Sequence, residues 1–118
     1  MLDHLVFLEC PVRIEDEIRA YWADKQPRFE RLLSTLRPDL SHLRLVVQRT
    51  KGRWRTRAAL SIPTATLAAR WDAEHWSEAL DGLADQLASE VRRHKARLRH
   101  DDPYFHQGLH SANWQTAS

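Results

Sequence analysis

Residues 76–98 read WSEALDGLADQLASEVRRHKARL, and this stretch decides the fold. Its large apolar residues recur at spacings of four, three, four, four and seven, and such spacings place them on one face of an α-helix. They are Trp76, Leu80, Leu83, Leu87, Val91 and Leu98. The pattern predicts a helix over residues 74–100 with Asp72 as its N-cap. A single apolar stripe of this kind packs against another layer of secondary structure.

Upstream of this helix the hydrophobic period changes to two, which is typical of half-buried strands. Apolar and polar residues alternate over residues 42–48, 53–62 and 65–71. Lys51-Gly52 and Pro63-Thr64 separate these segments and predict tight turns. We therefore expect three antiparallel strands, with Trp54 and Trp71 on the apolar face and the arginines on the opposite face.

The first third of the chain adds one strand and one helix. Residues 4–9, HLVFLE, predict a strand that ends before Pro11, and apolar residues then recur at helical spacing to about Leu36. Pro27 lies within that helix and should kink or break it. The element order is β-α-β-β-β-α, in which the first two strands are parallel. It predicts an α+β fold, a two-layer sandwich of a four-stranded mixed sheet with two helices packed on one face.

Length and composition indicate one globular domain. The chain has 118 residues, of which 29% are charged and 42% hydrophobic. The single cysteine, Cys10, excludes an internal disulfide and fits a reducing compartment. The sequence shows neither a signal peptide nor a stretch of membrane-spanning length, so we expect a cytoplasmic protein with no membrane partner. We assign residues 1–100 to the domain and residues 101–118 to an irregular tail.

Positive charge is gathered in two runs that contain no acidic residue, although the formal net charge is only +2. One run is Arg49, Lys51, Arg53, Arg55 and Arg57; the other is Arg92, Arg93, Lys95, Arg97 and Arg99. Clusters of this kind attract polyanions, and arginine suits bidentate contact with phosphate. The candidate RNA-binding residues are therefore Arg92, Arg93, Lys95, Arg97, Arg99, Arg53, Arg55 and Arg57. The simpler alternatives are favourable charge at a helix C-terminus and a solvated sheet face.

The other chemically capable residues do not form a recognisable active site. The spacings of His94, His100, His106 and His110 do not place a pair of metal ligands on one helix face, and no cysteine pair accompanies them. The chain has no glycine-rich phosphate loop and no nucleophile elbow. We expect His94 to pack at the helix–sheet seam, and we predict no catalytic residue, metal, cofactor or small-molecule substrate.

The order of elements resembles the hibernation-promoting factor and ribosome-associated inhibitor family, also known as sigma-54 modulation proteins. The resemblance covers about residues 4–100. It is clearest in WSEALDGLADQL followed by VRRHKARL, where the family has an aromatic residue, an alanine, an aspartate and a Leu-rich helix with a basic end. Ile18-Arg19-Ala20-Tyr21 with Lys25, and Leu60-Ser61-Ile62-Pro63 with Leu67 and Ala69, also match.

The resemblance implies a protein that binds the small ribosomal subunit through rRNA. Members of that family occupy the mRNA and tRNA channel, stop translation in non-growing cells and are not enzymes. Long members add a C-terminal dimerisation domain, for which residues 101–118 are too few, so the chain resembles the short form. Pro27 and the aromatic tail depart from the family pattern. Two alternatives stay open, a generic double-stranded RNA-binding domain and a protein-interaction module; an enzyme ranks below both.

Overall fold

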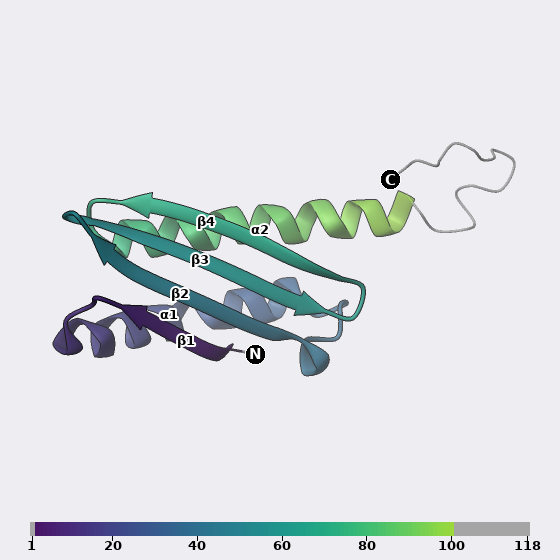
Figure 1. The fold of residues 1–118 in the computed structure, drawn as a ribbon. Helices are drawn as coiled ribbons and strands as arrows, with labels where there is room; N and C mark the ends of the chain where they lie inside the picture. Colours follow the sequence, from purple (N-terminus) through teal and green to yellow (C-terminus); the bar gives the residue numbers. More distant parts are fainter. Residues whose placement is uncertain (1, 101–118) are drawn as a thin grey trace, which may run out of the picture.

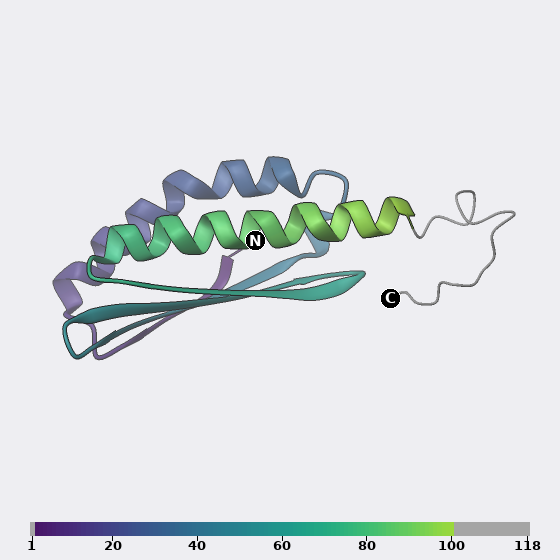
Figure 2. The same cartoon turned by 90° about the horizontal axis from the view of Figure 1, so that it is seen from above.

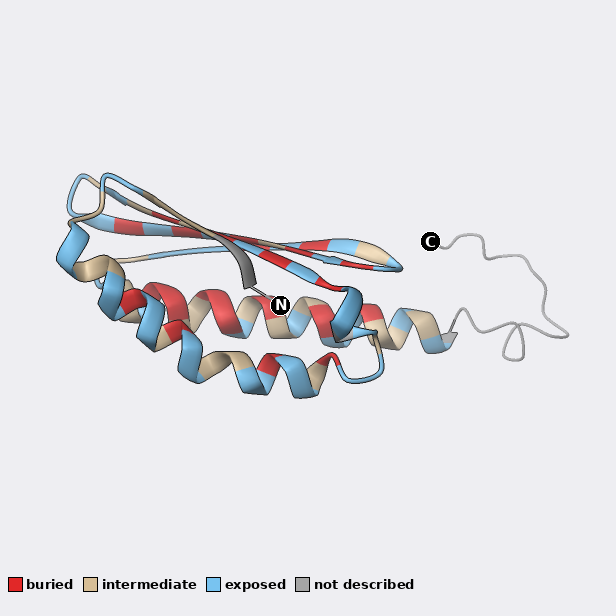
Figure 3. Cartoon of the chain, turned by 90° about the horizontal axis from the view of Figure 1, so that it is seen from below, coloured by how far each residue is buried: buried red, intermediate tan, exposed pale blue. Residues whose placement is uncertain are grey.

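The computed structural model describes residues 2–100 as two layers, with a sheet on one side and two long helices on the other (Figure 1). The elements are β1 (Leu2–Leu8), α1 (Val12–Leu32), a short 3₁₀ turn (Pro38–Leu40), β2 (His42–Thr50), β3 (Arg53–Ile62), β4 (Ala65–Ala73) and α2 (Trp76–His100). Both helices cover the same face of the sheet (Figures 2 and 3). The predicted α+β fold and element order are confirmed.

The sheet is four-stranded and mixed, in the order β1-β2-β3-β4. β1 and β2 are parallel, because α1 connects them across the face of the sheet, and the two later pairs are antiparallel hairpins. Lys51 and Gly52 have φ angles of 50° and 77° at the first hairpin turn. Positive φ at both central residues is the geometry that joins two antiparallel strands most tightly, and glycine adopts it without strain.

Pro27 bends α1 without ending it. A kink or a break is expected at Pro27; the break is wrong, because the helix continues through Pro27 to Leu32. The axis nevertheless changes direction along the helix (Figures 2 and 3), as expected where a proline lacks the backbone donor for one helical hydrogen bond. The helix also ends four residues before the predicted Leu36.

The core lies between the sheet and the helices. Leu80, Leu83, Leu87 and Val91 of α2 are fully buried, as are Leu43, Leu45 and Val47 of β2. Figure 3 shows the buried positions concentrated on the surfaces that face each other. Trp54 is buried as predicted, and Trp22 of α1 is buried as well. The period of 3.6 in α2 and of two in β2 and β3 therefore identified the core correctly.

Trp71 and Asp72 correct two expectations at the outer edge of the sheet. Trp71 is 45% exposed, so its predicted place in the core is wrong. β4 is an edge strand, and the bulky side chain of Trp71 extends past the core onto α2. Asp72 belongs to β4, its carboxylate lies 3.7 Å from Arg55, and it does not cap α2. The helix begins at Trp76, where the carbonyl of His75 accepts a hydrogen bond from the Ala79 amide.

The expected lack of a membrane span and the predicted tail can be compared with the structure only for residues 2–100. No helix within residues 2–100 carries an apolar stretch long enough to cross a bilayer. The predicted irregular tail, residues 101–118, lies outside the described residues.

Candidate nucleic-acid interface

A basic groove of about 540 Å³ runs between α1 and α2. Its apolar lining comes from Phe29 and Leu32 of α1 and from Ala84 and Ala88 of α2. Because residues three or four apart share a helix face, each helix presents a row of side chains to this groove. The small residues of α2 let its backbone lie near the larger side chains of α1.

Four cations and one carboxylate line the groove. The cations are Lys25, Arg28 and Arg31 of α1 and Arg92 of α2; the carboxylate is Asp85. Arg31 and Arg92 are exposed, and neither side chain makes a hydrogen bond or ion pair with another described residue. The groove therefore offers an uncompensated positive surface of the kind that phosphate groups neutralise.

Lys25 is held in place by a cluster at one end of the groove. Its Nζ lies 2.5 Å from Oδ1 of Asp81, and the Tyr21 hydroxyl donates a hydrogen bond to the same oxygen at 2.8 Å. Burial acts to raise the pKa of Asp81, but hydrogen bonds from Lys25 and Tyr21, with the charges of Lys25 and Arg28, hold it below its ordinary value. Asp81 is thus ionised at neutral pH and compensates Lys25, which leaves the arginines as the available cations.

Lys95 connects the two helices at Leu32, which lines the groove. Its Nζ donates a hydrogen bond of 3.0 Å to the carbonyl oxygen of Leu32, the last residue of α1. A cation at a helix C-terminus satisfies an unpaired carbonyl and interacts favourably with the helix dipole. Lys95 therefore joins α2 to the end of α1, a structural role that the sequence analysis did not assign to it.

The remaining candidates of the α2 run differ in their surroundings. Arg93 is ion-paired with Glu90 at 2.9 Å, and Arg97 and Arg99 are exposed. His94 is buried at the helix–sheet seam, as predicted, and its Nε2 is hydrogen-bonded to the Thr64 hydroxyl at 2.8 Å. Burial lowers the pKa of His94, and the nearby charge of Arg97 lowers it further.

The β3 candidates lie on the opposite side of the molecule. Arg53, Arg55 and Arg57 are all exposed, while Trp54 and Thr56 between them are buried. The structure therefore divides the predicted set between two surfaces, one between the helices and one on the open face of the sheet. Arg55 is compensated in part by Asp72, which lies on the neighbouring strand.

Sequence reasoning missed four further cations on these two surfaces. Arg28 and Arg31 join Arg92 in the groove, and Arg44 and Arg70 lie near Arg57 on the sheet. The spacing of three from Lys25 to Arg28 to Arg31 pointed to one side of α1. The neighbours of Arg57 could not be found before the strand register was known.

The described residues also bear on metal binding. Within residues 2–100 no group of three or more histidine, cysteine or acidic side chains is placed to hold a metal ion. What the two surfaces share is positive charge over small or apolar side chains.

Fold and surfaces together define a two-layer β-α-β-β-β-α domain with a basic groove between its helices. Among solved structures the chain is similar to the N-terminal domain of Protein Y from Thermus thermophilus, with a TM-score of 0.57 and 18% identity over 79% of this chain and 97% of that one. It is also similar to a ribosomal subunit interface protein from Coxiella burnetii, with a TM-score of 0.56 and 18% identity over 80% of this chain and 99% of that one. At this identity the likeness establishes the fold, and the expected resemblance is confirmed at that level. No family model matches the sequence, and no curated protein matches it.

Proposed function

We propose that the chain is a cytoplasmic, ribosome-associated hibernation factor that binds rRNA of the small subunit and blocks the mRNA and tRNA channel. The observation that carries the proposal is the interhelical groove, in which the side chains of Arg31 and Arg92 make no ion pair or hydrogen bond with another residue within residues 2–100. The shared fold of a ribosomal subunit interface protein supports the choice of the ribosome as partner. The protein would act by occupancy, without catalytic turnover.

Within this proposal the eight candidates have different roles. Arg92 contacts phosphate together with Arg28 and Arg31, and the exposed Arg97 and Arg99 extend that surface along α2. Lys95 holds the two helices together, and Arg93 contributes less because Glu90 already compensates its charge. Arg53, Arg55 and Arg57 belong to the separate sheet surface.

The test compares two variants that lose the same charge. In the groove variant Arg28, Arg31 and Arg92 are replaced by Ala; in the sheet variant Arg53, Arg55 and Arg57 are replaced by Ala. Binding to purified small subunits is measured by sucrose-gradient sedimentation at two salt concentrations. The groove variant should bind more weakly and with a smaller salt dependence, because each lost phosphate contact lowers the slope by at most about 0.9.

Other outcomes assign the function differently. An equal or larger loss from the sheet variant would move the ribosome contact to the open face of the sheet. If neither variant lost small-subunit binding, a protein-interaction module would become the better-supported function. Tight binding to free duplex RNA, unaffected by the presence of small subunits, would indicate a generic double-stranded RNA binder.

A further inference from the structure

The open face of the sheet carries three arginines that are not ion-paired with any carboxylate within residues 2–100. They are Arg44 of β2, Arg57 of β3 and Arg70 of β4, and none of their side chains makes an ion pair or hydrogen bond with another residue in the described part of the chain. Arg57 and Arg70 are direct partners in the β3–β4 register. Like charges placed directly opposite each other destabilise a sheet, so this pair is unfavourable until an anion lies between its members.

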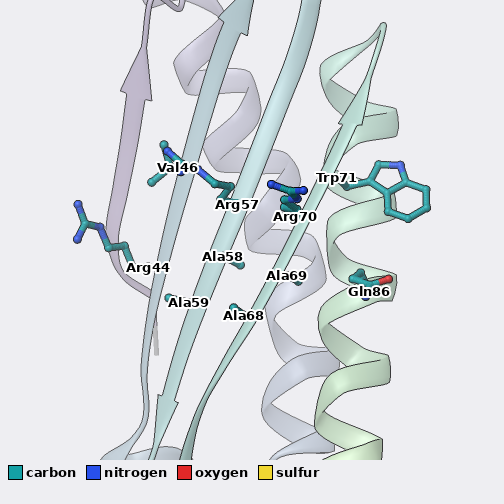
Figure 4. A pocket seen from close by; sticks show the side chains of 10 residues that line it. All are labelled: Arg44, Val46, Arg57, Ala58, Ala59, Ala68, Ala69, Arg70, Trp71 and Gln86. Atoms are coloured by element: carbon teal, nitrogen blue, oxygen red, sulfur yellow. The ribbon is translucent and has the colours of Figure 1, made fainter.

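The three arginines border a hollow of about 790 Å³ (Figure 4). Val46, Ala59 and Ala68 form its floor, and side chains this small leave the backbone of the sheet open to a flat ligand. Arg44 pairs with Ala59, two residues beyond Arg57, so the two arginines are diagonal neighbours at about 7–8 Å. A separation of this size allows different phosphates of one strand to contact different arginines.

The hollow continues over the β4 edge to Trp71 and Gln86 (Figure 4). Trp71 is 45% exposed, while its indole lies so close to Gly82 of α2 that a Cβ at position 82 would overlap the ring. One part of the indole is thus supported by the helix and another is open to solvent. A fixed, exposed aromatic ring beside a basic track is the combination by which proteins bind single-stranded nucleic acid.

We propose that this open face, together with the β4 edge at Trp71, is a second RNA site, which binds a short single-stranded segment independently of the interhelical groove. Arg57 and Arg70 hold a phosphate between them, Arg44 contacts a neighbouring phosphate, and an unpaired base stacks on Trp71. A duplex does not satisfy the site, because its bases are stacked on each other and unavailable to the indole. The inference goes beyond the proposed function, since it needs no ribosome.

The direct test is the fluorescence anisotropy of 5′-fluorescein-labelled octaadenylate RNA, titrated with the full chain at two salt concentrations. The double variant Arg57→Thr/Arg70→Thr should lower the affinity at least about tenfold and reduce the salt slope by about 0.7, since the two arginines share one phosphate and each phosphate contact on a single strand contributes about 0.7. Trp71→Leu should lower the affinity about tenfold without changing the salt slope, because stacking is lost while the charge is retained.

Two controls match these variants. Arg55→Thr/Asp72→Thr removes an ion pair from the same face without changing the net charge, and it should leave binding of the oligonucleotide unchanged. Arg28→Ala/Arg92→Ala removes two charges from the groove, and it should weaken small-subunit binding far more than binding of the oligonucleotide. Thermal melting of Arg57→Thr/Arg70→Thr should show no loss of stability, because a cross-strand repulsion has been removed.

Several results would overturn the site. They are failure of wild-type protein to bind octaadenylate, equal losses from the Arg57/Arg70 and Arg28/Arg92 doubles, and unaltered binding by Trp71→Leu. Competition by polyglutamate as effective as by unlabelled RNA would indicate an acidic protein partner and would also overturn it. Oligonucleotide binding without small-subunit binding would refute the proposed function alone, and the reverse result would refute this inference alone.

Discussion

The indole of Trp71 lies directly over Gly82: a Cβ built at position 82 would overlap the indole Nε1 and Cδ1. This contact accounts for a glycine within α2, where alanine would otherwise be the better helix former. It also accounts for the exposure of Trp71, because the ring extends beyond the edge strand and packs on the helix surface. The two residues are eleven positions apart and belong to different layers.

The Trp71–Gly82 contact predicts a change of sign for one substitution. Gly82→Ala should lower the free energy of unfolding in the wild-type chain, because the new methyl group displaces the indole. In a Trp71→Ala background the same substitution should raise it by up to about 1 kcal/mol, the ordinary gain of alanine over glycine in a helix. Urea denaturation of the four proteins measures both effects. A gain of equal size in both backgrounds would show that the indole does not lie on Gly82.

Leu83 tests the assignment of the apolar face of α2. Its side chain is fully buried, so Leu83→Ala should lower the free energy of unfolding by about 2–5 kcal/mol through the cavity that it leaves. Ser89→Ala, at an exposed position of the same helix, should change it by no more than about 0.5 kcal/mol. Similar melting temperatures for the two variants would contradict the packing of α2 on the sheet.

Substitution of Lys95 should affect stability, whereas substitution of Arg92 should affect binding. Lys95→Met keeps the apolar stem and removes the hydrogen bond to the Leu32 carbonyl, so it should cost about 1 kcal/mol of stability. Arg92→Ala should leave the melting temperature unchanged, because its side chain has no described partner, yet it should weaken sedimentation with small subunits. The opposite distribution, with Arg92→Ala less stable and Lys95→Met normal, would reverse the two roles.

His94 should make stability depend on pH just below neutrality. Its pKa in the folded state is lowered from 6.5 by burial, and by the charge of Arg97, so the unfolded chain binds the proton more readily. Its contribution is complete above the unfolded pKa and is lost as the pH falls below that value toward the folded pKa. Wild type should therefore lose more stability than His94→Gln between about pH 7.5 and about pH 5.5. Parallel losses would show that other groups carry the dependence.

The proposed occlusion of the ribosome has a stoichiometric signature. A protein that occupies a channel inhibits one small subunit per molecule, so translation in a purified system should fall in proportion to the protein added until protein and small subunits are equal in concentration. The groove variant at Arg28, Arg31 and Arg92 should shift this titration to higher concentrations. Complete inhibition at a small fraction of the ribosome concentration would indicate a catalytic mechanism and would contradict occupancy.

Local sequence determined the elements and most of the core. The stripe from Trp76 to Leu98 identified α2, and the alternation around Trp54 and Thr56 identified the inward face of β3. These predictions succeeded because a helix or strand repeats its own geometry over a few residues, so the period of the apolar side chains reports which face is buried. The same local reasoning recognised that the cationic runs lie at the surface.

Only the tertiary structure decided which charged and aromatic side chains meet. Arg57 faces Arg70 because of the strand register, Arg92 joins Arg28 and Arg31 because α2 lies beside α1, and Lys95 reaches Leu32 across 63 residues of sequence. Trp71 had the correct alternation for the core but lies on an edge strand, where no further strand covers it. Register, helix–helix packing and strand order each depend on the whole chain, and no local period contains that information.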